Sequence, residues 1–172
     1  MAEKIGEIKQ KLEETDISLL PAFVEQYKTD ARAGVQKLVQ TAGKRYQKLQ
    51  DEIARTEALK KYEKEYDNYT YICGIDEVGR GPLAGPVVAG AVILPKDCDI
   101  LYINDSKQLS AAKREELYDI IMEKAVATGI GMIGPERIDE INILQATYEA
   151  MRQAIGKLDP KPDLLLNDAV TI

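Results

Sequence analysis

Hydrophobic residues in the first 70 positions recur at helical spacing. Apolar side chains three or four positions apart fall on one face of a helix, where they can be buried together. Three such stripes occur, at Ile5, Ile8 and Leu12, from Leu19 to Tyr27, and from Val35 to Ile53. Asp16 or Ser18 is placed to cap the second helix. We therefore expect an all-helical N-terminal extension over residues 1–70.

From Tyr69 onward the pattern changes to one typical of β-strands. Residues 69–75 are β-prone, residues 86–94 form an apolar run rich in Val and Ala, and a turn rich in Gly and Pro joins them. Two such segments around a turn indicate paired strands. This opening of a sheet marks the start of a second domain, which we expect over residues 71–172.

Helices and strands then alternate. The pattern predicts a helix that begins after Ser110, a short strand at 129–133 and a buried strand at 163–168. Pro135 suits the first turn of a helix, and an amphipathic helix is expected over 143–158. Its predicted core face consists of Leu144, Tyr148, Met151 and Ile155. Strands followed by alternating helices and strands indicate an α/β domain, with a sheet flanked by helices.

Composition narrows the possible chemistry. The chain has 172 residues, no histidine and two cysteines. The absence of histidine excludes Ser-His and Cys-His nucleophiles and every metal site that needs a histidine ligand. Two cysteines cannot provide four zinc ligands or a disulfide framework. Catalysis would therefore rest on carboxylates, Lys, Arg, Tyr, Ser and bound ions.

Charge is distributed unevenly. Residues 1–70 hold 13 basic and 13 acidic residues, whereas residues 71–172 hold 10 and 16, which gives the second part a net charge of −6. An acidic domain binds nucleic acid poorly unless cations cover its acids. The charged start is unlike a signal peptide, and no apolar run approaches 18 residues. We expect a cytoplasmic protein with no membrane contact.

Two adjacent acids stand where the first predicted strand ends. Asp76 and Glu77 follow an apolar segment, and Asp168 follows the later one. Carboxylates at strand ends suit hard cations such as Mg²⁺ or Mn²⁺, which act in phosphoryl transfer. Because neighbouring side chains on a strand point to opposite faces, the first two acids share a site only through a twist, a bulge or a backbone carbonyl. A merely solvated turn is the alternative.

A glycine-rich turn follows the two acids. Gly79, Arg80 and Gly81 offer backbone groups free to approach a ligand and one guanidinium for phosphate. The spacing matches neither a Walker A loop nor a dinucleotide-binding fingerprint. Ser106 and Lys107 precede a predicted helix and are candidates for phosphate contact. A loop that only caps the helix is the other interpretation of that cluster.

Several segments resemble bacterial ribonuclease HII. The similarity is carried, in the family's order, by GIDEVGRGPLAGPVVAGAVILP at 74–95, NDSKQLS at 104–110, IDEINILQATYEAMRQAI at 138–155 and DLLLNDA at 163–169. Residues 1–70, with DARAGVQKL at 30–38, resemble the helical extension of some Gram-positive members.

This resemblance implies an RNase H-like fold and an activity. The family cleaves the RNA strand of RNA–DNA hybrids and incises 5′ of single ribonucleotides in duplex DNA. Its acidic metal site corresponds to Asp76, Glu77 and Asp168, with Mn²⁺ or Mg²⁺ as cofactor. Its Gly-Arg-Gly turn, here 79–81, contacts the ribose 2′-hydroxyl through its backbone. The residues Ser106 and Lys107 match positions that meet the phosphate backbone.

The family pattern continues beyond this sequence. A fourth catalytic Asp, in a Gly-Asp-Ala-Lys-Ser-like segment, and a substrate-reading Tyr would follow Ile172, so the sequence resembles a member truncated at its C-terminus. A monomer is expected. The alternative function is a catalytically inactive fragment that only binds hybrids or a protein partner. A nucleotide-binding enzyme is disfavoured, because the turn lacks the Lys and Thr of phosphate-binding loops.

Overall fold

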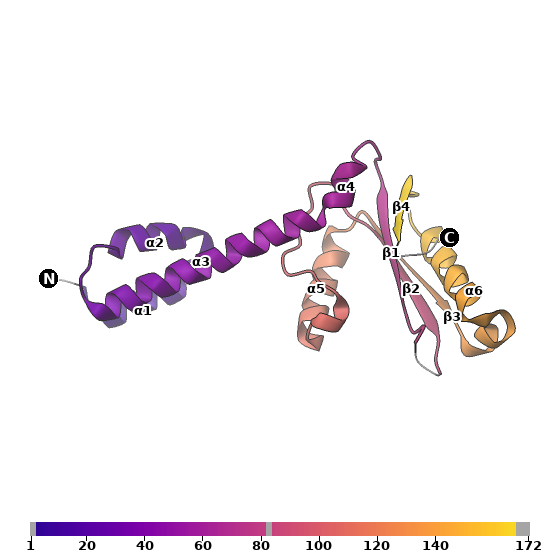
Figure 1. The fold of residues 1–172 in the computed structure, drawn as a ribbon, viewed down its shortest axis with the longest axis horizontal. Coiled ribbons are helices and arrows are strands. Elements are labelled where there is room, and N and C mark those ends of the chain that lie inside the picture. The colour runs from indigo at the N-terminus through magenta and orange to yellow at the C-terminus, as the bar shows by residue number, and fades with distance from the viewer. Residues whose placement is uncertain (1–2, 82–83, 168–172) are drawn as a thin grey trace. The chain divides into compact units, whose positions relative to one another are not determined.

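The computed structural model describes residues 3–81 and 84–167, and the chain divides into two compact units, Met1–Leu59 and Lys60–Ile172 (Figure 1). The first unit contains only helices, and the second contains a sheet with helices. The α/β fold with a helical extension that the sequence predicts is therefore confirmed. Among the described residues, no helix is long and apolar enough to cross a membrane.

The helical unit is built from α-helices and one 3₁₀ turn. Its elements are α1 (Ile5–Glu14), η1 (Ile17–Leu19), α2 (Leu20–Tyr27) and α3 (Ala33–Leu59). The side chains buried between them are Ile8, Leu12, Leu20, Phe23, Tyr27, Val35 and Ala42. These residues come from the three predicted stripes, so burial of one face of each helix holds the unit together.

Three members of the predicted stripes are not buried. Ile5 is 41% exposed, Leu19 is 59% exposed and Ile53 is 43% exposed. Leu19 belongs to η1 rather than to α2, which turns its side chain away from the helical stripe. Asp16 caps that 3₁₀ turn, because its carboxylate accepts a hydrogen bond from the Ser18 N–H.

An ion pair closes the corner between α2 and α3. The Arg32 guanidinium donates to both carboxylate oxygens of Asp30 and to the backbone oxygen of Glu3. The Arg32 hydrogen bonds lower the pKa of Asp30 to about 2. This arrangement gives the Asp-Ala-Arg segment before α3 a structural role, since it ties the corner to the backbone of Glu3, just ahead of α1.

In the described part of the sheet unit, four strands form one sheet in the order β3-β2-β1-β4. Its elements are α4 (Lys61–Glu65), β1 (Ile72–Val78), β2 (Val87–Ile93), η2 (Ser106–Gln108), α5 (Ala111–Lys124), β3 (Ala127–Ile133), α6 (Pro135–Gly156) and β4 (Leu164–Asn167). Neighbouring strands are antiparallel except for β1 and β4, which are parallel. Ser110 caps α5 as predicted, with its hydroxyl accepting from the Lys113 N–H.

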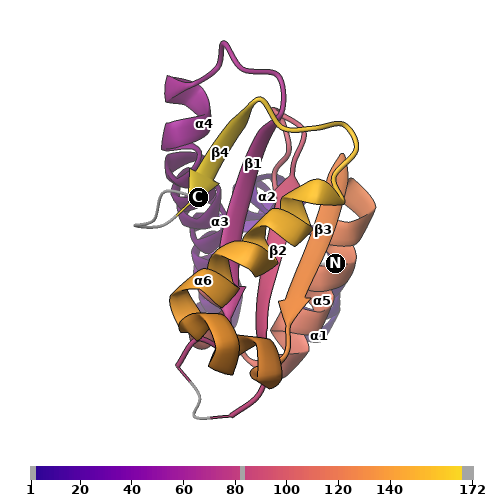
Figure 2. The ribbon, with the colours of Figure 1, turned by 90° about the vertical axis from the view of Figure 1, so that its right-hand side faces the viewer.

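Helix α6 lies across one face of the sheet (Figure 2). Two glycines of β3 allow this approach. A Cβ atom on Gly131 would lie 1.9 Å from the Ala150 carbonyl oxygen, and one on Gly129 would lie 2.2 Å from that of Ala154. Both distances are too short for any side chain. The two backbones therefore meet directly, and small residues line the contact on both sides.

This close packing corrects the predicted core face of the second helix. Of the predicted face, Met151 is buried and Ile155 packs against the core, whereas Leu144 is 37% exposed. The other buried residues of α6 are small: Ala146, Thr147, Ala150 and Ala154. A prediction based on hydrophobic size selects the larger side chains of α6. Because the helix backbone lies directly against Gly129 and Gly131, the face of α6 that carries the alanines is the one that packs on β3. Helix α6 begins at Pro135, as predicted, and the non-helical Asn142, with φ of 68°, divides it so that a second segment starts at Ile143, where the sequence also predicts a helix.

The outer edge of β3 is covered by α6 side chains. The Lys157 ammonium donates to the carbonyl oxygen of Ile130 at 2.6 Å, and the Gln153 side-chain oxygen accepts from the Met132 N–H at 3.3 Å. Both backbone groups point away from β2. With two of its outward groups occupied, this edge strand is a poorer template for pairing with other strands.

Replacing Gly131 tests the α6–β3 contact. We expect Gly131→Ala to lower the free energy of unfolding by roughly 1–3 kcal/mol, because the added methyl group forces the two backbones apart. Urea denaturation followed by circular dichroism measures the change. The matched control is Gly90→Ala, where a Cβ meets no atom within 4 Å. Ala at position 90 should leave stability unchanged or raise it by about 0.5–1 kcal/mol. Equal midpoints for the two variants would contradict this account of the packing.

Candidate active site

Asp76 and Glu77 lie on opposite faces of β1. The pairing of β1 with β2 runs without a bulge from Cys73↔Ile93 to Val78↔Val88, so side chains alternate along it. Cys73 and Ile75 are buried on the face that α6 covers, and Asp76 is exposed on the other face. The bulge that would let both side chains share one site is therefore not present in this strand. Glu77 can reach the face of Asp76 only through its backbone.

Two glycines leave space beside Asp76. Gly90 is its direct partner on β2, and Gly74 precedes it by two positions on the same face of β1. An added Cβ on either glycine would have no atom within 4 Å. The Asp76 carboxylate accepts a hydrogen bond from the Glu77 N–H at 2.8 Å, which orients it at the end of the strand. An oxygen donor with open flanks suits a hard cation.

Glu77 is paired with the turn that follows it. Its carboxylate lies 3.3 Å from the Arg80 guanidinium, and 18% of the Glu77 side chain is exposed. The contact joins the end of β1 to the Gly-Arg-Gly turn. An exposed ion pair of this kind contributes little stability, so its main effect is to restrict the position of the turn.

The glycines of the turn have different reasons to be glycine. Gly79 has φ of 94°, and a Cβ there would lie 2.3 Å from the Pro86 carbonyl oxygen. Its lack of a side chain is therefore needed to close the β1–β2 connection. Gly81 has no positive φ, and a Cβ would meet nothing within 4 Å among the described atoms. Neither backbone strain nor crowding in this part of the chain explains why position 81 is glycine.

Strand β4 brings a distant segment to the side of β1. Leu166 pairs with Gly74, and Asn167 pairs with Ile75, the residue before Asp76. The third predicted acid, Asp168, lies outside the described residues. Within residues 3–81 and 84–167, no three Cys, Asp or Glu side chains form a group able to hold a metal ion. The two acids of β1 are therefore the described part of the candidate site.

Asp163 fixes the start of β4 against β1. Its two carboxylate oxygens accept hydrogen bonds from the Thr70 and Tyr71 N–H groups, both at 2.8 Å. The Thr70 hydrogen bond is the main cause that lowers the pKa of Asp163. The sequence analysis did not single out this positioning residue. The available signal for this role was an acidic residue between Pro162 and an apolar run, and that pattern is equally typical of a solvated turn.

Ser106 and Lys107 lie in an exposed loop before α5. Asp105 accepts from the Lys107 N–H, and Arg114 donates to the carbonyl oxygens of Ser106 and Leu109. No hydrogen bond or ion pair connects this loop to the 76–81 segment in the described parts of the chain. The structure therefore does not bring the two predicted clusters together through such contacts.

Family profiles match both parts of the sequence. The ribonuclease HII N-terminal domain matches residues 4–67, and the ribonuclease HII domain matches residues 73–172. A ribonuclease HII from Lachnoclostridium phytofermentans is 63% identical over 169 residues, which cover 98% of this chain and 66% of that protein. The chain belongs to the ribonuclease HII family. A member from Listeria monocytogenes serotype 4a is 46% identical over 174 residues, which cover all of this chain and 66% of the relative.

The chain thus spans about two thirds of the length of these ribonuclease HII relatives. Among solved structures, ribonuclease H2 from Pyrococcus horikoshii OT3 gives a TM-score of 0.47 at 28% identity and covers 59% of this chain and 52% of that one. Bst-RNase HIII in complex with Mn²⁺ gives 0.44 at 20% identity, with 59% and 37% covered.

Removing the Asp163 carboxylate should destabilise the sheet unit in a pH-dependent way. Because folding lowers this pKa, the carboxylate adds stability above its unfolded pKa of about 3.9 and loses it as pH falls through the folded value. We expect Asp163→Asn to melt at a lower temperature than wild type at pH 7, with the difference shrinking near pH 3. Thermal unfolding at both pH values measures this. Asp97→Asn, at an exposed acid with no hydrogen bond in the described chain, should behave as wild type; a constant deficit for Asp163→Asn would contradict the pH argument.

Proposed function

We propose that this chain provides the nuclease site of a ribonuclease HII. The site hydrolyses the RNA strand of RNA–DNA hybrids and incises 5′ of ribonucleotides embedded in duplex DNA. Membership of the family supports the reaction class. The observation that carries the proposal is the position of Asp76, which lies near the carboxyl end of β1 on the face opposite α6 and has glycines on two sides. That space is suited to an ion and a phosphate.

Asp76, Glu77 and Asp168 are the proposed ligands of Mg²⁺ or Mn²⁺. The direction of β4 supports the inclusion of Asp168, because β4 runs parallel to β1 and Asn167, which precedes Asp168 in the sequence, pairs with Ile75, which precedes Asp76. Bound ions would supply activation of water and stabilisation of the leaving 3′-oxygen. Asp76 holds an oxygen ligand at a fixed place, and Glu77 contributes through its backbone or by restraining Arg80.

The Gly-Arg-Gly turn is the proposed reader of the ribose. Only the 2′-hydroxyl separates RNA from DNA at a given residue, and it both donates and accepts hydrogen bonds. Gly79 shapes the turn, which leaves the backbone of Gly81 accessible without a side chain in the way. Arg80 carries a positive charge for a neighbouring phosphate. These properties favour recognition through backbone groups.

Further parts of the proposal rest on the sequence. Ser106 and Lys107 would contact the phosphate backbone beside the cleaved bond, and the protein would act as a cytoplasmic monomer. We also propose a domain boundary near residue 70. The interval between the two family matches, at 68–72, supports this boundary, although α4 groups with the sheet unit.

Asp76→Asn tests the metal site. We expect loss of incision by at least about 100-fold, because a neutral amide holds a divalent cation far less well than a carboxylate. The substrate is a labelled DNA duplex with one ribonucleotide, with Mn²⁺ or Mg²⁺ added. The variant is made both in the 172-residue chain and in a version extended with the remaining third of the Lachnoclostridium relative.

Asp97→Asn serves as the matched control and should retain full activity. A chelator should stop incision by the active version, and isothermal titration should detect Mn²⁺ binding that Asp76→Asn removes. Normal incision by Asp76→Asn would disprove the assignment of this residue. Hybrid binding that a chelator leaves unchanged, in a chain that binds no metal, would favour the non-catalytic module instead.

Gly81→Ala tests the reading of the ribose. The free energy of unfolding should stay within about 0.5 kcal/mol of wild type, as for a surface change away from special features. Incision at the ribonucleotide should fall roughly tenfold or more, because the methyl group displaces the sugar from one backbone hydrogen bond. Gel assays of incision combined with urea denaturation separate the two effects. Unchanged incision would exclude close approach of the substrate at this position.

A further inference from the structure

A long segment of the helical unit contains basic residues but no acidic residues. Between Ala31 and Gln50 the sequence has no Asp or Glu, and its basic residues are Arg32, Lys37, Lys44, Arg45 and Lys48. The proposed nuclease site makes no use of this segment. The whole unit, residues 1–59, holds 10 basic and 10 acidic residues, so the positive charge is concentrated locally rather than spread over the unit.

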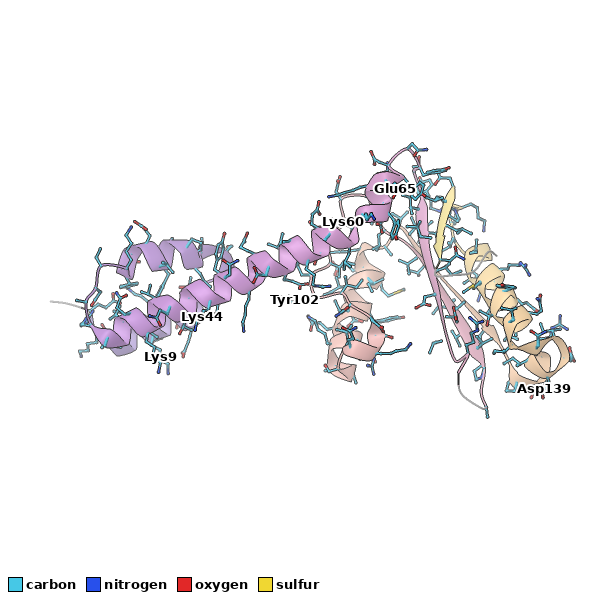
Figure 3. All side chains as sticks on the ribbon, viewed as in Figure 1. Lys9, Lys44, Lys60, Glu65, Tyr102 and Asp139 are labelled. Atoms are coloured by element: carbon cyan, nitrogen blue, oxygen red, sulfur yellow. The ribbon has the colours of Figure 1, made fainter. Side chains whose placement is uncertain are left out.

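Three of these lysines form a row on the exposed side of α3. Lys37, Lys44 and Lys48 are seven and four positions apart, which places them on one face of a helix with 3.6 residues per turn. All three are exposed, and the buried Val35 and Ala42 lie on the other face. Figure 3 shows the Lys44 side chain extending away from the helix. We call Lys37, Lys44 and Lys48 the basic stripe.

The lysines of the basic stripe differ from most other basic residues of the helical unit in their ion pairing. Lys9, Lys11, Lys28, Arg32 and Arg55 each form an ion pair with a nearby acid. No ion pair involves a lysine of the basic stripe within the described residues. The acid that follows along the helix, Asp51, accepts a hydrogen bond from Gln47. The stripe therefore keeps its full positive charge, with uncharged Gln40 and Thr41 between its members.

We propose that the basic stripe binds the phosphate backbone of a nucleic-acid duplex. The inference deepens the proposed function, on which it rests for the kind of partner. Lys37 and Lys48 are about 16 Å apart along the helix, at 1.5 Å per residue. This length is close to half of a duplex turn of about 34 Å, so the row can follow phosphates along one strand. Backbone contacts of this kind position a protein without reading sequence.

The negative charge of the sheet unit explains why a positive stripe on the helical unit would help the chain bind a duplex. Residues 60–172 hold 13 basic and 19 acidic residues, a net charge of −6. A unit with this charge repels a duplex everywhere except where cations or local bases cover it. The helical unit is neutral overall, and its basic stripe, which forms no ion pair among the described residues, would attract the phosphates of a duplex. The basic stripe would raise affinity for any duplex, while discrimination of the ribonucleotide would remain at the turn.

Duplex binding by the 172-residue chain tests the inference. The probe is a fluorescent DNA duplex without ribonucleotides, measured by anisotropy in the presence of a chelator over a series of salt concentrations. The variant is Lys44→Gln/Lys48→Gln, since Gln keeps helix propensity and removes the charge. We expect the slope of log K against log salt to fall by about 2, and affinity at 0.1 M salt to fall on the order of tenfold or more.

The matched control is Lys9→Gln/Lys28→Gln, which removes the same charge from two ion-paired lysines of the same unit. It should keep the wild-type slope, and circular dichroism should show equal helix content in both double variants. Equal losses in the two variants, or no duplex binding by wild type, would overturn the inference. Equally strong competition by polyglutamate, matched in charge, would overturn it in favour of a general anion-binding or acidic-protein surface. Because the probe contains no ribonucleotide and no metal is present, these outcomes are independent of the incision tests.

Discussion

The parallel pairing of β1 with β4 is the contact on which the candidate site depends. The two strands are separated by some 90 residues of sequence, and the Asp163 carboxylate joins them by accepting from two backbone groups ahead of β1. Because side chains along a strand point alternately to its two faces, a register slip of one residue would move each side chain of β4 to the other face. The register set at Asp163 therefore decides which residues at the end of β4 share a face with Asp76.

Glycines on the two faces of the sheet have opposite effects. Gly129 and Gly131 admit the α6 backbone so closely that no side chain fits between the helix and β3. Gly74 and Gly90 leave empty space beside Asp76 on the other face. The same residue type thus closes one side of the sheet and keeps the other accessible. This difference explains why a carboxylate at the end of a buried strand remains exposed.

Periodicity predicted which elements form, because burial of one face requires a regular spacing of apolar residues. It failed where packing depended on small residues. The α6 stripe at Leu144 was wrong because no hydrophobicity pattern encodes the approach to Gly131. The positions of Asp76 and Glu77 at the end of a strand were predictable, and so was the expectation that they point to opposite faces. The capping of β4 by Asp163 depends on a distant backbone segment, and the local signal, an acid between Pro162 and an apolar run, is equally typical of a solvated turn.

The partly covered edge of β3 affects where another strand can join the sheet. Because the Lys157 ammonium and the Gln153 side-chain oxygen bind the Ile130 carbonyl and the Met132 N–H, a strand from another chain or segment would have to displace both side chains to pair along β3. A strand added beside β4 would instead lie two strands from Asp76. Extension of the sheet on that side would therefore bring new residues near the candidate site.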